Sequence, residues 1–285
     1  MERVPGDYEL DFLSECTKEQ LDPLVSILLK AATNYLDINP DYKRYRPDHT
    51  KYVSAIIADF QLFGGNSVAN TFRGHGVRYR EILEDVCDNQ KVPYDKSAPT
   101  EIIEKVLLEK SLRSMWSKMS EEQREQILKE LGAGSLNVTG TGASALLAIF
   151  RMGGFESYKV MVMLVNGLAT AILGRGLAFG ANAALTKTIS IVTGPIGWAV
   201  GGAWTLLDIA SPAMRVTVPG TVYIAALREI KRNEKIAKEI SEKIKQKLEA
   251  EREKKIAKQK MRTFITWVSL AMLVVTIIVA CLACK

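Results

Sequence analysis

The sequence has little cysteine and almost no histidine. Its four cysteines are too few and too scattered to form a disulfide framework in 285 residues. Cys16 and Cys87 fall in helical apolar patterns, so we expect both to be buried thiols of a reducing compartment. Neither His49 nor His75 has a cysteine or carboxylate partner at metal-ligand spacing. We therefore expect no disulfide-stabilised fold, no metal site and no cofactor.

The sequence also lacks a secretion signal and regular strand patterns. Its first eleven residues carry four acidic side chains, the opposite of a basic segment before an apolar core. No segment alternates polar and apolar residues well enough to predict a strand. With 47% hydrophobic residues the chain can bury a sizeable core, and its net charge of +6 is modest. The expected fold class is all-α.

Capping residues and helical spacing predict a helical domain over residues 1–134. Thr17 and Gln20 have the spacing of a capping box, and the leucines that follow repeat with the helical period. Ser120 caps an acidic first turn in the same way. The segment Asp41–His49 is polar, basic and aromatic, and we expect it to be a loop. Further helices are expected at three places: Tyr52–Phe63, Val77–Cys87 and Thr100–Met119.

One segment, Phe63–Glu81, brings basic side chains together with glycines and asparagines. A Gly-rich backbone with arginines is what an anion or phosphate site needs. The alternative is a tight connection between helices whose arginines pair with nearby carboxylates, and we favour it because no P-loop Lys-Ser/Thr follows. The candidate anion or partner site consists of Arg73, His75, Arg78 and Arg80.

An enzyme is the least favoured class of function. It would use Arg73, His75 and Arg80 on an anionic substrate, but the sequence contains no nucleophile elbow that would support acyl transfer. The glycines after Gly140 are no dinucleotide fingerprint, because no convincing strand precedes them. We name no catalytic residue.

Residues 153–212 form a Gly/Ala-rich block with two uncharged runs, Val160–Gly174 and Thr188–Leu207. The second run is long enough to cross a bilayer, but it contains glycines and a proline and is bounded by charged residues. We favour a tightly packed helical core, and the alternative is a stress or defence effector whose block inserts into the membrane. Glycines four residues apart would let helices approach closely: Gly176, Gly180, Gly197 and Gly201.

Long stretches of the chain resemble a known family. The segment GRGLAFGANAALTKTISIVTGPIGWAVGGAWTLLDIASPAMRVTVPGTVYIAALR (Gly174–Arg228) and the motif FGGNSVANTFRGHGVRYREILEDVCD (Phe63–Asp88) resemble the YaaW-like family of uncharacterised bacterial proteins. The resemblance covers Asp7–Arg228. It implies a domain similar to ubiquinol–cytochrome c chaperones, which are helical assembly factors, and it implies no catalytic residue. A C-terminal extension departs from the shorter family pattern.

A highly charged helix is expected after Val218-Pro219-Gly220, which should restart the chain. Lys231–Arg262 contains 13 Lys/Arg and 6 Asp/Glu, and its apolar residues form only a thin helical stripe. It is either a solvated stalk or a docking helix for a partner or anionic lipid. Nucleic acid is not favoured, because the basic residues have no interleaved aromatics.

Thr263–Cys284 is 22 residues long and contains no charged residue, proline or glycine. As a helix it spans roughly 33 Å, enough for the hydrocarbon core of a bilayer. Five basic residues precede it at the membrane interface: Lys254, Lys255, Lys258, Lys260 and Arg262. By the positive-inside rule, the N-terminal part lies in the cytoplasm. The sequence therefore predicts a tail-anchored, single-pass protein of the bacterial inner membrane.

These patterns divide the chain into four parts. We expect a helical domain over 1–134, a Gly/Ala-rich helical domain over 135–228, a basic stalk helix over 229–262 and a transmembrane anchor over 263–284. The expected function is a non-enzymatic scaffold or assembly factor at the cytoplasmic face, with a protein partner or a second copy of the chain as its binding partner.

Overall fold

The computed structural model describes residues 2–31, 35–64, 74–135, 142–175, 177 and 213–283, with only the backbone for parts of 254–283. These residues form helices and no strand, apart from an isolated bridge between Glu2 and His75. The expected all-α class is confirmed for this part of the chain. The α-helices are α1 (Lys18–Leu29), α2 (Pro40–Tyr45), α3 (Val53–Phe63), α5 (Tyr79–Asn89), α6 (Thr100–Ser117), α7 (Glu121–Glu130), α8 (Ala143–Arg151), α9 (Gly154–Leu173) and α12 (Met214–Ala283). Short 3-10 helices are η1 (Asp11–Glu15), η2 (His49–Lys51) and η3 (Ala133–Ser135).

The chain divides into two compact units, Met1–Glu234 and Lys235–Lys285, and α12 contributes to both. The first unit contains one hydrophobic core, whose buried side chains extend from Leu10 to Ile230. The four-part division expected from the sequence stays a prediction.

Two helix starts follow the sequence signals closely. The Thr17 hydroxyl accepts a hydrogen bond from the Gln20 backbone N–H at 3.3 Å, and the Thr17 N–H donates to the Gln20 side chain at 3.0 Å. Ser120 and Gln123 repeat this capping box at the start of α7. Cys16 and Cys87 are buried free thiols, as expected, and burial raises the pKa of each to about 12.

The expected loop Asp41–His49 is partly helical, and that prediction was wrong. The Asn39 side chain accepts hydrogen bonds from the backbone N–H groups of Asp41 and Tyr42, and Pro40 occupies the first position of α2. Asparagine at the N-cap and proline at the first position both favour a helix start. A second difference is that α5 begins at Tyr79, because Val77 lies extended and donates to the Gln61 carbonyl at 3.1 Å.

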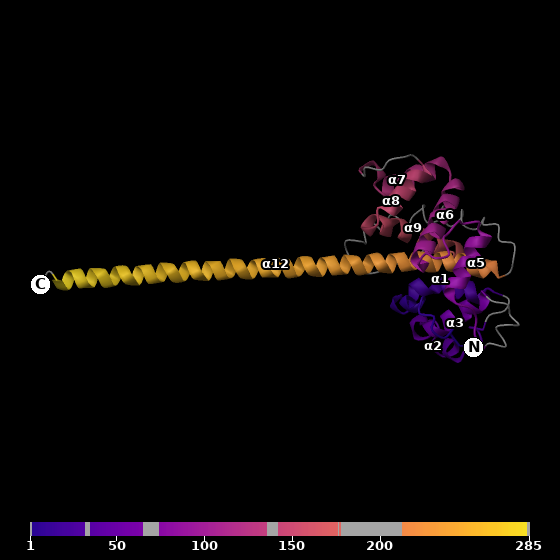
Figure 1. Ribbon diagram of the computed structural model, residues 1–285, viewed down its shortest axis with the longest axis horizontal. Helices are drawn as coiled ribbons and strands as arrows, with labels where there is room; N and C mark the ends of the chain where they lie inside the picture. The colour runs from indigo at the N-terminus through magenta and orange to yellow at the C-terminus, as the bar shows by residue number, and fades with distance from the viewer. Residues whose placement is uncertain are drawn as a thin grey trace. The chain divides into compact units, whose positions relative to one another are not determined.

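The described part of the Gly/Ala-rich block is a core helix. Among the described residues, α9 is the one helix long and apolar enough to cross a membrane, but 67% of its apolar window is buried inside the protein. It packs with α1 and α8 in the first unit (Figure 1). The favoured interpretation of the block, a tightly packed helical core, therefore agrees with the burial of α9. The second uncharged run of the block, Thr188–Leu207, lies outside the described residues.

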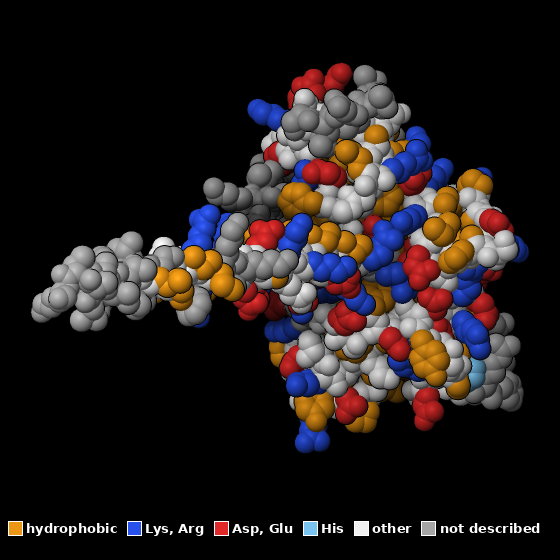
Figure 2. All heavy atoms as spheres, turned by 60° about the vertical axis from the view of Figure 1, so that its left-hand side comes forward, with side chains coloured by type: hydrophobic (Ala, Val, Ile, Leu, Met, Phe, Trp, Pro, Cys, Tyr) orange, Lys and Arg blue, Asp and Glu red, His pale blue; other side chains and the backbone are white. Residues whose placement is uncertain are grey.

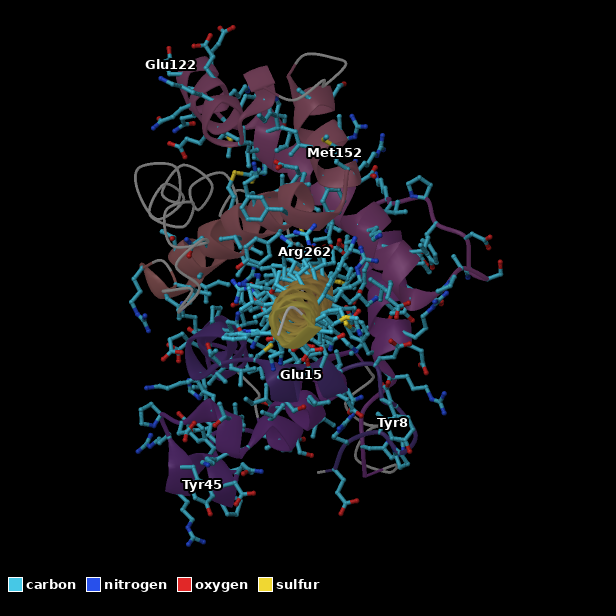
Figure 3. The ribbon with its side chains drawn as sticks, turned by 90° about the vertical axis from the view of Figure 1, so that its left-hand side faces the viewer. Tyr8, Glu15, Tyr45, Glu122, Met152 and Arg262 are labelled. Carbon is cyan, nitrogen blue, oxygen red and sulfur yellow. The ribbon has the colours of Figure 1, made fainter. Side chains whose placement is uncertain are left out.

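The first part of α12 lies at the centre of the first unit. Helices of this unit surround it (Figure 3). Its side chains contact α1, α6 and α9, and its backbone at Gly220 lies against Phe60 of α3. The Tyr223 hydroxyl donates to the Gln20 carbonyl at 2.8 Å. The expected restart at Val218-Pro219-Gly220 was wrong, because α12 begins at Met214 and runs through all three residues. Pro219 lies past the first turn of α12, so its missing N–H removes one backbone hydrogen bond inside the helix.

Candidate functional site

The structure describes three of the four residues of the candidate anion site. Arg73 lies outside the described residues. The His75 ring is half-buried, and its Nδ1 donates to the Gly76 carbonyl at 2.9 Å. Arg78 is exposed immediately before α5. These positions test no anion binding, so the site stays a prediction.

Arg80 is already bound to protein groups. Its Nε donates to the Glu84 carboxylate at 2.6 Å, one turn along α5. Its two terminal nitrogens donate to the carbonyl oxygens of Ala98 and Lys96 at 2.7 and 2.9 Å. Arg80 therefore ties α5 to the segment before α6. Arg80 itself thus pairs with a neighbouring carboxylate, as the alternative of a tight connection between helices expects.

The other predicted sites fall largely outside the described residues. None of the four candidate packing glycines, Gly176, Gly180, Gly197 and Gly201, is described. Of the basic residues before the apolar run, three have described side chains, and all three are exposed: Lys255, Lys260 and Arg262. The side chains of Lys254 and Lys258 are not described.

A buried ion pair joins α12 to α6 in the first unit. The Nε of Arg228 lies 2.8 Å from the Glu104 Oε2, and the two side chains are 16% and 3% exposed. The Tyr79 hydroxyl donates to the other Glu104 oxygen at 2.6 Å. The Arg228 guanidinium also lies over the rings of Phe12 and Tyr79, with centroids 4.5 and 5.7 Å away. One cation thus connects side chains from η1, α5, α6 and α12.

The environment of this pair opposes ionisation of the carboxyl. Burial raises the pKa of Glu104, while Arg228 and the Tyr79 hydroxyl lower it, and the pKa is raised on balance. Burial also raises the pKa of the Tyr79 hydroxyl well above 10. A phenol held in its protonated form donates to the carboxylate but supplies no nucleophile. The cluster therefore holds α5, α6 and α12 together.

A second polar network begins at Asp7. Its carboxylate accepts the Tyr79 backbone N–H at 2.7 Å and the Gln61 amide at 2.8 Å. The Gln61 side-chain oxygen in turn accepts the Val4 N–H at 2.9 Å. Asp7 and Gln61 are both buried. The network attaches the N-terminal segment to α3 and α5, because each buried polar group finds a partner.

A third cluster is a chain of Asp22, His49 and Tyr52. The His49 Nε2 lies 2.5 Å from Asp22 Oδ1, and His49 Nδ1 is hydrogen-bonded to the Tyr52 hydroxyl. Asp22 also pairs with Arg175 at 2.7 Å. Because the carboxylate only accepts hydrogen bonds, Nε2 of His49 donates to it, and a neutral ring then accepts from the phenol at Nδ1.

The hydrogen-bonded residues Asp22, His49 and Tyr52 have the composition of a catalytic relay, but the phenol at the end of the series is held protonated. A relay needs a nucleophile whose proton is easily removed. Burial is the largest cause that raises the pKa of Tyr52 to about 12, so its hydroxyl stays protonated at neutral pH. The arrangement connects α1 to η2 and α3 and, through Arg175, to the end of α9. Among the described residues, no group of three or more metal-ligating side chains could hold a metal ion.

Sequence reasoning missed several charged groups inside or at the edge of the core, among them Glu104, Arg228, Asp22 and the buried Asp59 of α3. Glu104 carried a signal, since it lies on the same helical face as Leu107, Leu108 and Ser111 and had to be buried with them. Arg228 carried none, because its partner lies 124 positions away in the chain.

Comparison with known proteins places the chain in a family. Over 231 residues the chain is 40% identical to a UPF0174 protein of Helicobacter pylori (strain J99). This match covers 78% of this chain and 91% of the relative. Over 238 residues it is 31% identical to the UPF0174 protein YaaW of Escherichia coli (strain K12), covering 79% and 95%. No family model and no solved structure matches. The YaaW-like resemblance is therefore confirmed, and the chain belongs to the UPF0174 family.

Proposed function

We propose that this chain is a membrane-anchored, non-enzymatic scaffold or assembly factor. In this proposal residues 263–284 form a single-pass anchor in the bacterial inner membrane, and the first unit works at the cytoplasmic face. Its client is a membrane protein or a second copy of the chain.

The observation that carries the proposal is an exposed apolar stretch on α12. Ile265, Trp267 and Met272 are 55%, 68% and 67% exposed, and Val268 and Leu270 are exposed with them. Figure 2 shows orange side chains next to blue Lys and Arg side chains along the described part of this helix. Soluble proteins rarely leave so many large apolar side chains in water on one segment. A bilayer would cover them, and the helix backbone continues to Ala283.

Basic residues support the proposed orientation. Lys255, Lys260 and Arg262 are exposed on the helix just before the apolar stretch. Lysines and arginines next to a membrane span favour the cytoplasmic side, where anionic lipid attracts them. Trp267 lies near the same end, where an indole ring is favoured at the membrane interface.

The use of polar groups in the first unit supports a non-enzymatic role. Arg80, Glu104 and Arg228 each bind other protein groups and connect helices. The buried phenols of Tyr52 and Tyr79 have raised pKa values, which disfavours nucleophilic chemistry. In this proposal the helical unit is held at the membrane and binds a client protein through its surface without catalysing a reaction.

Cross-linking in intact membranes tests the proposal. Three tagged chains are compared: the full chain, the chain ending at Arg262, and a chain in which an unrelated span of equal length replaces 263–284. We expect the full chain and the replacement to cross-link to the same membrane protein or to a second copy. The truncated chain should lose that product, because it is no longer held at the bilayer.

Two results would argue against a scaffold at the membrane. One is the same cross-linked product with the truncated chain, which would make the anchor irrelevant to partner binding. The other is no discrete product with any of the three chains under conditions in which a known inner-membrane complex cross-links.

A further inference from the structure

Asp59 is a buried carboxyl in the middle of α3. Its residue is 2% exposed. Its Oδ1 accepts the Tyr35 backbone N–H at 2.9 Å, and its Oδ2 accepts the Leu36 N–H at 3.3 Å. Both donors are neutral backbone groups. Each carboxylate oxygen retains a lone pair for a further donor.

No cation balances this carboxyl within the described part of the chain. The ion pairs found there involve Asp11, Asp22 and several glutamates, but not Asp59. Burial raises the pKa of Asp59, and the two backbone donors lower it only in part. A buried charge without a counter-charge is costly, so a cation that reaches this carboxyl would be bound favourably.

Asp59 borders a cavity of about 180 Å³, which is also lined by residues of α2 and α3. Six of the nine lining residues are apolar, and polar groups also contribute to the wall. The Asn39 side chain also borders it, but its oxygen already caps α2. Tyr35 adds an aromatic ring, and Asp59 adds the one carboxyl among the lining residues. The apolar lining residues are Leu36, Ile38, Pro40, Ala55, Ala58 and Leu62.

We propose that this cavity binds a small alkylammonium ion. The ammonium group lies against the Asp59 carboxylate, and a short alkyl chain lies against Ile38, Pro40 and Leu62. The volume is that of roughly six water molecules in the liquid, which suits a chain of about four carbons. The ammonium supplies the donors that the carboxylate lacks, and burial of the alkyl chain adds apolar contact.

Other ligand classes fit these walls less well. An anion would be repelled by the carboxyl. A calcium or magnesium ion takes about six or more oxygen ligands, and Asp59 is the one carboxyl among the residues that line the cavity. A neutral apolar molecule would fill the space but leave the carboxylate without a counter-charge. A cation with a single charge and a short apolar tail would pair with the Asp59 carboxylate and also contact the apolar lining residues.

Calorimetric titration of the full chain in detergent micelles with n-butylammonium chloride tests the proposal. We expect saturable one-to-one binding, and no binding of n-butanol or butyrate at the same concentrations. Asp59→Asn should weaken n-butylammonium binding by about tenfold or more, because a charge-assisted hydrogen bond is lost. Asp41→Asn removes a nearby exposed carboxyl and should leave the affinity unchanged.

A second variant keeps the test decisive if Asp59→Asn folds poorly. Ala55→Leu leaves the carboxyl in place and fills part of the cavity, so it should abolish binding while circular dichroism stays that of the parent. The absence of saturable binding to the full chain would overturn the proposal. So would equal affinity of the full chain for n-butylammonium and n-butanol, or unchanged affinity in both Asp59→Asn and Ala55→Leu.

Discussion

At the scale of single residues, charges inside the first unit link distant segments. Arg228 of α12 lies against Glu104 of α6, between the rings of Phe12 and Tyr79. Removing one partner of a buried pair is costly because the other charge stays buried and unpaired. Removing both partners together restores an uncharged interior.

We expect Arg228→Met to lower the free energy of unfolding by about 3–5 kcal/mol, the range for breaking a buried ion pair. Arg113→Met is the matched control: Arg113 is exposed on α6, and its loss should change stability by no more than about 0.5 kcal/mol. Urea unfolding followed by circular dichroism measures both. The double variant Arg228→Met, Glu104→Met should recover most of the loss, and equal losses in Arg228→Met and Arg113→Met would refute a structural role for the pair.

Asp59 makes stability depend on pH. Because its folded pKa is raised above the unfolded value of 3.8, the folded chain binds its proton more tightly than the unfolded chain does. The stability that this proton contributes is fully present below pH 3.8 and is lost as the pH rises through the folded pKa. Asp59→Asn should remove that loss.

The measurement is the free energy of unfolding of both chains from pH 4 to pH 8. Glu104, Asp85 and Glu130 also have raised pKa values, so the difference between the two profiles, and not either profile alone, reports Asp59. We expect the variant to gain stability relative to the parent as the pH rises. A difference that does not change with pH would show that Asp59 titrates alike in both states.

At the scale of elements, helices with local signals could be predicted from the sequence. The capping boxes at Thr17 and Ser120 depend on residues within one turn, so sequence alone located α1 and α7. The start of α2 was missed, although Asn39 and Pro40 are equally local signals. The segment was predicted to be a loop from its basic and aromatic composition. The start of α12 was misplaced because packing of the core overrides the breaker tendency of Pro219 and Gly220.

The candidate site could be predicted less well, for a physical reason. Arg80 has three acidic residues near it in sequence, and the pairing with Glu84 needs only one helical turn. The partners of Arg228, Asp22 and Asp59 come from distant parts of the chain, and their pairing depends on the tertiary arrangement. No local spacing encodes such contacts.

The contact between α3 and α12 depends on the absence of a side chain at Gly220. A Cβ there would lie 2.5 Å from Cε2 of Phe60, whose ring is fully buried. Gly220→Ala should therefore lower the melting temperature, with an overpacking cost of about 1–3 kcal/mol. A scan by circular dichroism measures it, and Gly134→Ala, which has open space around it, is the control. Adding Phe60→Leu to Gly220→Ala should restore part of the loss, and an unaffected Gly220→Ala would contradict this packing.

At the scale of the whole molecule, the two apolar helical segments differ in what covers them. The apolar face of α9 is buried by the protein in the first unit. The described side chains from Ile265 to Met272 are exposed in the second unit. Both segments are long and apolar, so hydropathy alone does not distinguish a core helix from a membrane span. The burial of the described side chains differs between the two segments. Our proposal therefore places 263–284 in the bilayer, whereas α9 belongs to the protein core.

The membrane assignment is tested most directly by washing isolated bacterial membranes with alkaline carbonate. The full chain and the chain ending at Arg262 are compared, together with Leu270→Arg in the apolar run and Leu248→Arg in the basic helix. An arginine costs up to about 2.5–3.5 kcal/mol in a span. We predict that the full chain and Leu248→Arg stay in the membrane pellet, that the truncated chain is released, and that Leu270→Arg is released in part. Release of the full chain, or retention of the chain ending at Arg262, would contradict the anchor.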